Sequence, residues 1–316
     1  MQIKTALISV YDKTGVVELA KRLKNVKILS TGGTAKLLRE NGVEIVDVSE
    51  YTGSDEIMDG RVKTLHPKIY AGLLAKRDDK KHMDELKKLG IDPIDLVVVN
   101  LYPFEETVAS NPSMQEAVEK IDIGGPTMIR AAAKNFISVA VDPADYSKID
   151  VNVSDDVIKE LVVKAFSRAA DYNSSIEKYL GKELEGKNYF RASFIDGVEM
   201  RYGENPHQKA MFFKAKNVKE TSVPYGTQLN GKQLSYNNIL DTDSALGIAK
   251  EFSEPTVAII KHLNPCGVAC GSSIAEAYKK ALECDSVSAF GSVVGMNKVC
   301  DKETAEEISK VFTEVV

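Results

Sequence analysis

The sequence predicts an α/β protein whose core is a parallel sheet, and three observations support this prediction. Short apolar segments, such as 3–10 and 26–29, have the pattern of buried strands. Segments with a helical spacing of apolar residues alternate with them. Glycine-containing turns follow several of the apolar segments. Strands that are apolar along their whole length are typical of parallel sheets with helices on both faces.

The first part of the chain alternates strands and helices. Residues 3–10, 26–29 and 44–48 are predicted strands. Asp12 is a suitable N-cap for a helix over 13–23, and a second helix, 35–40, ends at Asn41-Gly42. Residues 49–68 have the composition of a long functional loop. Beyond it we expect helices over 67–76, 128–134 and 154–180, and strands over 96–99 and 138–141.

A polar stretch around residues 181–187 predicts a boundary between two domains, 1–187 and 188–316. In the second domain we expect strands over 189–195, 210–213 and 256–260 and helices over 244–252, 274–282 and 302–312. Residues 314–316 look like the opening of a further strand. The sequence contains no internal repeat.

Composition narrows the class of protein. The 316 residues suffice for roughly two domains, and 43% hydrophobic and 28% charged residues suffice for a sizeable core. A formal net charge of −5 argues against general affinity for nucleic acid, because phosphate-backbone binding needs a basic surface. No apolar run approaches the roughly 20 residues of a membrane span, and the first residues lack a signal-peptide layout. The four cysteines, all between residues 266 and 300, make no disulfide framework, so we expect a cytoplasmic protein.

The turn Ser30-Thr31-Gly32-Gly33-Thr34 has the pattern of a phosphate-binding site. It leads from a predicted strand into a predicted helix. Glycines let the backbone approach an anion, and the N–H groups of the first helical turn point toward it. The sequence contains neither a P-loop nor a dinucleotide fingerprint, so the site is sized for a phosphate monoester, as on a nucleotide or sugar phosphate.

Two later stretches bring charged residues to the same edge of the predicted sheet, where ligands of such sheets bind. Arg61 and Lys63 lie in the polar loop, and Lys134 ends a helix of small apolar residues. Each could be an ordinary surface charge. Asp122, which precedes two glycines and a proline, could be only a helix cap, or it could form an acid–base pair with Lys134.

Cys266, Cys270 and His262 resemble a zinc site only in part. Zinc nucleoside deaminases use Pro-Cys-x-x-Cys and His-x-Glu, whereas three residues separate the cysteines here and no Glu follows His262 at that spacing. We therefore expect no metal. Lys261 and His262, at the end of a predicted buried strand, are better interpreted as a polar pair facing a cleft. The alternative is a satisfied, partly buried histidine.

Several long motifs follow one another in order along the chain. In the first half they are SVYDKTG (9–15), STGGT (30–34), GRVKTLHPK (60–68), NLYPF (100–104) and DIGG through AAAKN (122–135). In the second half they are RYGENPHQ (201–208), LSYNN (234–238), KHLNPCG (261–267) and SAFG (288–291). Together they resemble the two halves of the bifunctional AICAR transformylase/IMP cyclohydrolase family of purine biosynthesis.

This resemblance implies a fold like that of methylglyoxal synthase for the first domain. For the second it implies an α/β fold like that of cytidine deaminase, incomplete here and without zinc. The implied chemistry is the last two steps of IMP synthesis. A formyl group moves from the co-substrate 10-formyltetrahydrofolate to AICAR, and the product, FAICAR, closes to IMP with loss of water. The cyclohydrolase needs no metal.

The same resemblance implies roles for individual residues. The implied nucleotide contacts of the cyclohydrolase are Ser9, Lys13, Thr31, Gly32, Gly33, Thr34, Arg61, Thr64, Ile123 and Gly124. The implied catalytic groups are Lys63, Asn100 and Tyr102 as donors to the reacting oxygen, and Asp122 with Lys134 for proton transfer. In the transformylase, Lys261 and His262 match the catalytic pair, and Arg201, Tyr202, Asn237 and Asn264 match AICAR-binding positions.

The family's transformylase half continues beyond residue 316, and much of its folate site lies there. We therefore expect ring closure to be kept and formyl transfer to be lost in this chain. The resemblance also implies a homodimer whose partners are the small molecules FAICAR, IMP and AICAR, without nucleic acid or membrane. The alternative function is a regulatory nucleotide-binding module on the same fold. A sensor needs the phosphate turn, but it does not need Lys63, Tyr102, Asp122 and Lys134.

Overall fold

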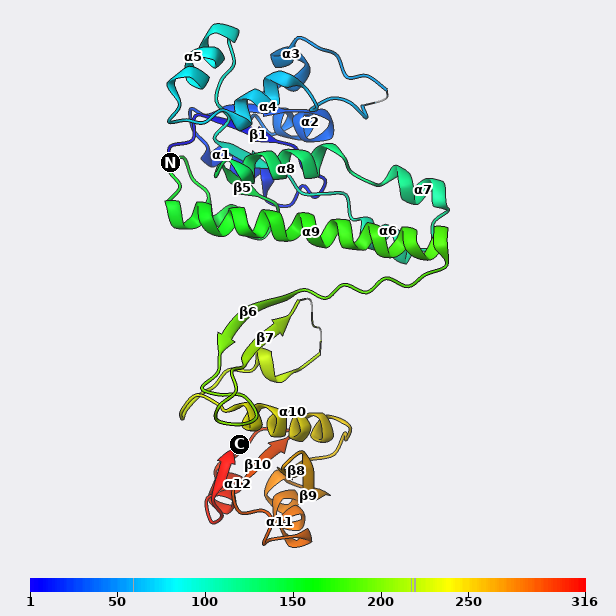
Figure 1. Cartoon of the computed structure of the whole chain (residues 1–316), viewed down its shortest axis with the longest axis vertical. Helices are drawn as coiled ribbons and strands as arrows, with labels where there is room; N and C mark the ends of the chain where they lie inside the picture. Colours follow the sequence, from blue (N-terminus) through cyan, green and yellow to red (C-terminus); the bar gives the residue numbers. More distant parts are fainter. Residues whose placement is uncertain (59, 217, 219) are drawn as a thin grey trace. The chain divides into compact units, whose positions relative to one another are not determined.

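The computed structural model describes residues 1–58, 60–216, 218 and 220–316. The chain forms two compact units, residues 1–191 and 192–316, which are drawn in Figure 1 and described separately below. Among the described residues, no helix is both long enough and apolar enough to cross a lipid bilayer.

The first unit is built on a five-stranded parallel sheet, as predicted. Its strands are β1 (Thr5–Ile8), β2 (Lys27–Ser30), β3 (Val46–Asp47), β4 (Leu96–Val98) and β5 (Ser138–Ala140). They lie in the order β3-β2-β1-β4-β5, and every neighbouring pair is parallel. The chain builds outward from β1 to β3 and then returns to place β4 on the other side of β1. The carboxyl ends of β1 and β4 therefore lie where the strand order reverses, which is the usual ligand site of such sheets.

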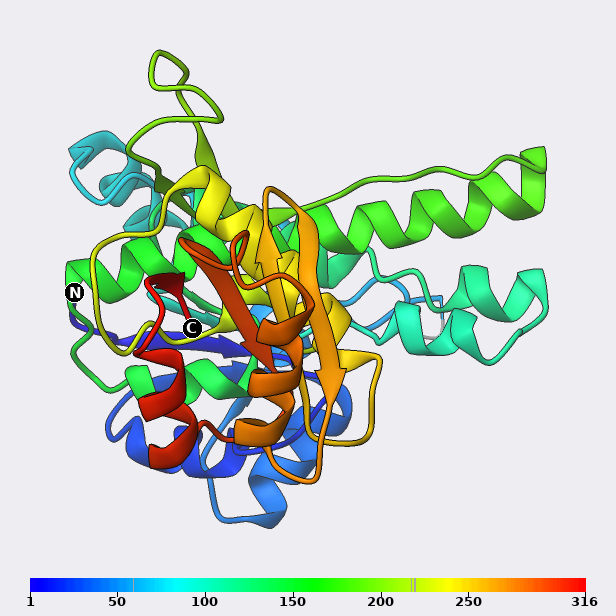
Figure 2. The same ribbon diagram turned by 90° about the horizontal axis from the view of Figure 1, so that it is seen from below.

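Helices surround this sheet. They are α1 (Val16–Arg22), α2 (Gly32–Glu40), α3 (Val48–Thr52), α4 (Pro67–Leu74), α5 (Lys80–Leu89), α6 (Phe104–Ala109), α7 (Met114–Glu119), α8 (Gly124–Lys134), η1 (Pro143–Lys148) and α9 (Asp155–Glu185). α8 and α9 pack against each other and against β5. In both ribbon views α9 extends past the sheet, and α6 and α7 lie beside this extension (Figures 1 and 2).

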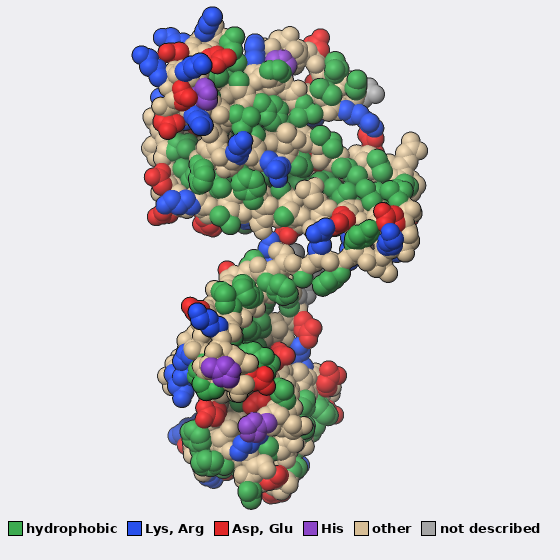
Figure 3. All heavy atoms as spheres, viewed as in Figure 1, with side chains coloured by type: hydrophobic (Ala, Val, Ile, Leu, Met, Phe, Trp, Pro, Cys, Tyr) green, Lys and Arg blue, Asp and Glu red, His purple; other side chains and the backbone are tan. Residues whose placement is uncertain are grey.

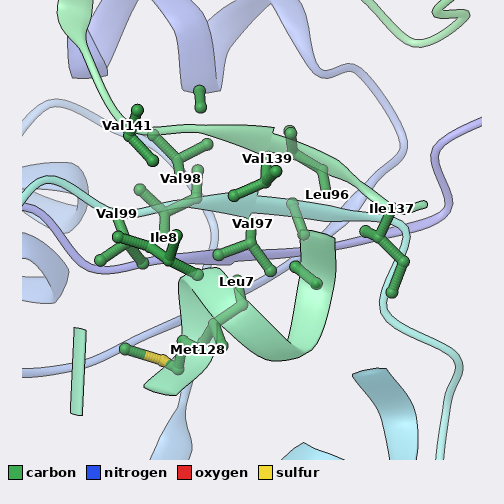
Figure 4. Close-up of a cluster of buried hydrophobic side chains, with 14 of the residues drawn as sticks. Leu7, Ile8, Leu96, Val97, Val98, Val99, Met128, Ile137, Val139 and Val141 are labelled. Atoms are coloured by element: carbon green, nitrogen blue, oxygen red, sulfur yellow. The ribbon is translucent and has the colours of Figure 1, made fainter. Parts of the chain in front are cut away.

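The core of the first unit explains why its strands are mostly apolar. Side chains of neighbouring strands, among them Ile8, Val97 and Val139, are completely buried, and Met128 of α8 lies next to them (Figure 4). Because both faces of the sheet are covered, successive residues of a strand are buried alike rather than alternately.

Two features at the start of the first unit differ from the prediction. Helix α1 begins at Val16 rather than at Lys13, because Gly15 takes a left-handed φ of 67° just before it. Asp12 does not cap this helix. Its carboxylate accepts hydrogen bonds from the N–H and hydroxyl of Thr14, 2.9 and 2.7 Å away, and so forms a local turn.

The sequence analysis left α5, α6 and α7 unassigned, although cap residues for α5 and α7 are present in the sequence. Asp79 accepts from the N–H groups at the start of α5, and Gly90 ends it with a φ of 64°. Ser113 and Glu116 form a capping box at the start of α7. α6 and α7 have only six residues each, and the apolar periodicity used to find the other helices is weak over so short a segment.

The second unit contains a four-stranded mixed sheet and a separate hairpin. The strands of the mixed sheet are β8 (Thr256–Lys261), β9 (Asn264–Cys270), β10 (Ser292–Met296) and β11 (Thr313–Val315), in the order β11-β10-β8-β9. The hairpin pairs β6 (Phe194–Glu199) with β7 (Met211–Ala215). The helices are α10 (Tyr236–Lys250), α11 (Ile274–Cys284), α12 (Lys302–Ile308) and the short η2 (Val223–Tyr225).

The expected strand over 189–195 is wrong in its bounds, because β6 begins only at Phe194 and its residues are exposed. β9 was not predicted, since Pro265 and Gly267 are poor strand formers. The expected strand at the end of the chain is present as β11. Acidic and basic side chains are interspersed over the faces of both units that Figure 3 shows.

Candidate active site

The predicted phosphate turn lies at the carboxyl end of β2, where the chain enters α2. Ser30 is buried, and its hydroxyl donates to the carbonyl oxygen of Ile8 at 2.7 Å, which ties the turn to β1. Thr31 is extended and makes no side-chain cap for α2. Gly32 has a φ of 56°. The first N–H groups of a helix lack intrahelical acceptors, so this turn can donate them to an anion.

Lys13 places a positive charge beside this turn. Its Nζ donates to Thr34 Oγ1 at 3.0 Å and to the carbonyl oxygen of Val10. The N–H of Val10 also donates to Thr34 Oγ1, at 3.1 Å. Burial and the nearby Lys63 ammonium lower the pKa of Lys13. Ser9, half-buried just after β1, uses its N–H to bond Val98, so β1, β4 and the turn are fastened together. An incoming phosphate would neutralise the two ammonium groups.

The polar loop brings Lys63 and Thr64 between the phosphate turn and α8. A Cβ built on Gly32 would lie 3.6 Å from Lys63 Nζ, and one built on Gly124 would lie 3.1 Å from the hydroxyl of Thr64. Thr64 is buried. Arg61, in contrast, is exposed and forms an ion pair with Glu119 of α7. The loop thus delivers one ammonium group to the site and holds its neighbouring guanidinium in a surface pair.

Asp122 sits at the N-terminus of α8, in the second glycine turn. Its Oδ1 accepts from the N–H of Gly125 at 2.8 Å. Its own N–H donates to the Tyr172 hydroxyl of α9, also at 2.8 Å. Burial raises the pKa of Asp122, while the N–H groups of Gly125 and Gly124 and the charge of Lys63 act against the rise. A partly buried carboxylate of raised pKa next to an ammonium group is suited to accept and return a proton.

Tyr102 follows β4 and lies beside this carboxylate. It is 39% exposed and meets Tyr11 edge-on, with ring centroids 5.2 Å apart. Burial, together with the charge of Asp122 and the neighbouring Tyr11, raises the pKa of Tyr102, so its hydroxyl stays protonated and can donate. Lys120 Nζ lies 5.8 Å from the same ring. Tyr11 and Lys120 were not identified from the sequence, because their proximity to Tyr102 arises only from the fold.

Asn100 has a structural use that the sequence did not reveal. Its Oδ1 accepts from the N–H groups of Tyr11 and Asp12 at 2.6 and 2.9 Å, and its Nδ2 donates to the carbonyl oxygen of Asp12. The amide therefore clamps the loop after β1 to the loop after β4. Asn100 also lines a cleft of about 440 Å³ at this edge of the sheet, together with Tyr11, Asp12 and Arg168.

The predicted acid–base pair of Asp122 and Lys134 is not formed. Asp122 precedes the first residue of α8, and Lys134 is its last. A helix of 11 residues is about 16 Å long, so the two side chains lie at opposite ends of it. Lys134 is exposed there, whereas the neighbouring Ala131, Ala132 and Ala133 are buried. Ile123 is 61% exposed beside the site.

Thr31 has a partner that the sequence analysis missed. Its hydroxyl donates to Glu56 Oε1 at 2.6 Å. The carboxylate comes from the same polar loop as Lys63. An anion that uses the Thr31 hydroxyl would therefore have to displace this carboxylate.

In the second unit, Lys261 and His262 lie at the turn between β8 and β9. His262 and Leu263 are the two central residues of that turn and have φ values of 53° and 64°. Left-handed conformations are costly for residues other than glycine, and such strain often marks functional sites. His262 is exposed, so the alternative of a buried, satisfied histidine is wrong.

The turn is held by three hydrogen bonds. The N–H of Leu263 donates to Asp241 Oδ1 of α10 at 2.7 Å. Lys261 Nζ donates to the carbonyl oxygen of Phe290, and Asn264 Nδ2 donates to the carbonyl oxygen of His262, each at 2.8 Å. These bonds fix the backbone that presents His262 to solvent.

Three of the four predicted AICAR-binding residues lie on two connected segments, and the fourth, Asn264, begins β9. Arg201 stacks over the ring of Tyr202, with 5.6 Å between the guanidinium carbon and the ring centroid. Asn237, in the first turn of α10, donates at 3.5 Å to the carbonyl oxygen of Glu204 in the same loop. Among the described residues, no group of three or more His, Cys, Asp and Glu side chains is placed to hold a metal ion.

Two family models match this chain. The model described as AICARFT/IMPCHase bienzyme matches residues 132–316, and the model described as MGS-like domain matches residues 15–127. The first of these covers more than half of the chain.

Curated relatives extend the match to nearly the whole chain. A protein named bifunctional purine biosynthesis protein PurH, from Bacillus cereus (strain B4264), is 51% identical over 326 aligned positions, which cover 99% of this chain. The protein of the same name from Bacillus mycoides (strain KBAB4) is 52% identical over the same extent. The chain spans 64% of the length of these relatives. Among solved structures, one titled "Crystal structure of ForH" is 32% identical, with a TM-score of 0.49, over 57% of this chain and 99% of that one.

Proposed function

The chain belongs to the AICARFT/IMPCHase bienzyme family, and on this basis we propose that its first unit closes FAICAR to IMP. The observation that carries the proposal is the meeting of three loops at one edge of the sheet. They bring Lys63, Tyr102 and Asp122 next to a turn with the geometry of a phosphate site. A module that only binds nucleotide needs the turn but not these groups.

In the proposed complex, the 5′-phosphate lies on the turn from Thr31 to Thr34. Lys13 supports this placement, because its ammonium group already bonds Thr34. The other proposed contacts are Ser9, Gly32, Gly33, Arg61, Thr64, Ile123 and Gly124. The nucleotide displaces Glu56 from Thr31, and Arg61 contacts it after leaving its ion pair with Glu119.

In the proposed reaction, the carboxamide nitrogen attacks the formyl carbon, and the formyl oxygen gains negative charge. Lys63 and the Tyr102 hydroxyl donate to this oxygen, which lowers the barrier. Asp122 accepts the proton that the carboxamide nitrogen loses and returns it to the oxygen, which becomes a hydroxyl group. The C–O bond then breaks and the hydroxyl takes up a second proton to leave as water, while the former formamide nitrogen loses its own proton and forms the C=N bond of the ring. The raised pKa of Asp122 supports this role, since it brings a carboxylate closer to the pKa range of an effective general base. Asn100 acts by holding the loops, and a role for Lys134 stays a prediction.

For the second unit we propose that its residues supply one part of the family's formyl-transfer site, with 10-formyltetrahydrofolate as co-substrate of the complete site. His262 accepts the amino proton of AICAR, and Lys261 supplies positive charge at the folate nitrogen. Arg201, Tyr202, Asn237 and Asn264 hold AICAR. The strained turn at His262 supports its role. The division of labour between residues 1–187 and 188–316, a homodimeric state and a cytoplasmic location are part of the same proposal. Four free cysteines in the described part of the chain fit a reducing compartment.

The proposal is tested by mixing the purified chain with FAICAR and following the absorbance of IMP. We expect catalytic formation of IMP. Nucleotide binding without turnover would contradict the proposal and would favour the regulatory alternative. A parallel reaction with AICAR and 10-formyltetrahydrofolate tests the second activity separately.

A further inference from the structure

One stripe of helix α9 touches the turn that carries Asp122 and the start of α6, just after Tyr102. Arg168, Tyr172, Ser175 and Tyr179 follow one another at intervals of four, three and four residues, so they share one face of the helix. Each of the four contacts either the Asp122 turn or the first residues of α6.

The hydroxyl of Tyr172 bonds the main chain at two points, at Asp122 and at Lys120, where the chain enters the Asp122 turn. It accepts from the N–H of Asp122 at 2.8 Å and donates to the carbonyl oxygen of Lys120 at 3.3 Å. The side chain of Tyr172 is 1% exposed. Asp122 and Tyr172 are 50 residues apart in sequence, so this is a specific long-range tie. Its loss would leave a partly buried N–H group without its acceptor, which is costly.

The same stripe holds the first two residues of α6, which follow Tyr102 closely in the chain. Phe104 is fully buried between Tyr172 and Tyr179, with ring centroids 6.2 and 5.8 Å away. The carboxylate of Glu105 accepts from Arg168 at 2.9 Å and from Ser175 at 3.3 Å. Both residues follow Tyr102 within three positions, so their attachment to α9 limits where the Tyr102 ring can lie.

Packing alone does not require the Tyr172 hydroxyl. A phenylalanine ring fills the same space against Phe104 and Arg168. The hydroxyl adds only the two bonds to the 120–122 main chain, and that segment carries the carboxylate of the proposed reaction.

We propose that Tyr172 is a positioning residue for ring closure, which sets the place of the Asp122 carboxylate through the main chain of residues 120–122. This inference rests on the proposed function of the first unit. Because Asp122 reacts only when it faces the substrate nitrogen, a small displacement of the turn lowers turnover without weakening the hold on the phosphate.

The test compares Tyr172→Phe with a matched control, Tyr51→Phe. The Tyr51 hydroxyl also accepts from the N–H of an aspartate, Asp92, at the same 2.8 Å, but Asp92 lies at the amino end of the sheet. We expect Tyr172→Phe to lower kcat for IMP formation about tenfold or more, with KM and IMP affinity unchanged. Tyr51→Phe is expected to keep the wild-type kcat. Melting temperatures of both variants report any general loss of stability.

A double-mutant cycle with Asp122→Asn separates positioning from a general structural effect. If Tyr172 acts through Asp122, Tyr172→Phe produces little further loss in the Asp122→Asn background. A wild-type kcat in Tyr172→Phe, or the same tenfold loss in both backgrounds, would overturn the inference.

Amide hydrogen exchange provides a readout that does not depend on turnover. We expect Tyr172→Phe, but not Tyr51→Phe, to speed exchange in residues 120–125. Unchanged exchange there would overturn the positioning role even if the wild-type chain proved inactive. A wild-type chain without turnover would by itself overturn the proposed function instead.

Discussion

We expect nucleotide binding to depend most directly on backbone conformation at Gly32. Its φ of 56° is disfavoured for other residues, and a Cβ there would lie in ordinary contact with Lys63 Nζ, 3.6 Å away. We predict that Gly32→Ala weakens IMP binding about tenfold, or roughly 1.4 kcal/mol, in isothermal titration calorimetry. Gly42→Ala is the control, because Gly42 has a φ of 75° and open space around its Cβ position. Equal affinities of the two variants would contradict the placement of the phosphate.

The raised pKa of Asp122 makes the stability of the folded state depend on pH. Its folded-state pKa is raised by burial above the ordinary value of 3.8, so the folded state holds the proton more tightly than the unfolded state. The protonated Asp122 side chain therefore contributes favourably to the free energy of unfolding below pH 3.8, and this contribution is lost as the pH rises through the folded-state pKa. We predict that Asp122→Asn matches the wild type in unfolding free energy below pH 3.8 and exceeds it at pH 7. Urea unfolding over a pH series checks this, and a difference independent of pH would refute it.

At this scale the sequence predicted groups that are neighbours along the chain. The phosphate turn was found because its strand, its glycines and its helix follow one another directly. The Asp122–Lys134 pair failed because an uninterrupted helix separates the two residues. The role of Tyr172 could not be seen, since its spacing in α9 predicts only a buried position and its partner is main chain 50 residues away.

At the scale of elements, α9 contributes both to the core and to the site. Leu161 is fully buried on the face toward the core, whereas Val163, two residues later, is 69% exposed. We predict that Leu161→Ala lowers the unfolding free energy by about 2–5 kcal/mol. Val163→Ala should change it by less than about 0.5 kcal/mol. Similar urea midpoints for the two variants would show that α9 is not packed as described.

The elements that were predicted and missed differ in how their burial arises. β1, β2 and β4 were recognised because parallel strands covered on both faces are apolar throughout. β9 was missed because its position next to β8 depends on a tight turn with two left-handed residues, His262 and Leu263. The sequence of that turn contains no common hairpin dipeptide, such as Asn-Gly, from which it could have been predicted.

At the scale of the whole molecule, the proposed binding site for FAICAR and IMP lies in the first unit. Ligand that binds only the folded state stabilises it, by about 2.7 kcal/mol at a concentration of 100 Kd. We predict that IMP slows amide exchange in residues 9–13, 31–34, 61–64 and 120–125, the segments that form the site. Protection confined to residues 192–316 would show that IMP binds the second unit and would contradict the proposed site.

The proposal that the first unit closes FAICAR to IMP is tested most directly by the rate of IMP formation in Asp122→Asn. Asp92→Asn is the matched control, because Asp92 belongs to the same unit but pairs with Lys27 at the amino end of the sheet. We predict that Asp122→Asn binds IMP like the wild type and converts FAICAR at a rate at least about a hundredfold lower. We predict that Asp92→Asn retains the wild-type rate. Equal rates in the two variants would contradict the proposal that the loops carrying Lys63, Tyr102 and Asp122 form the ring-closing site.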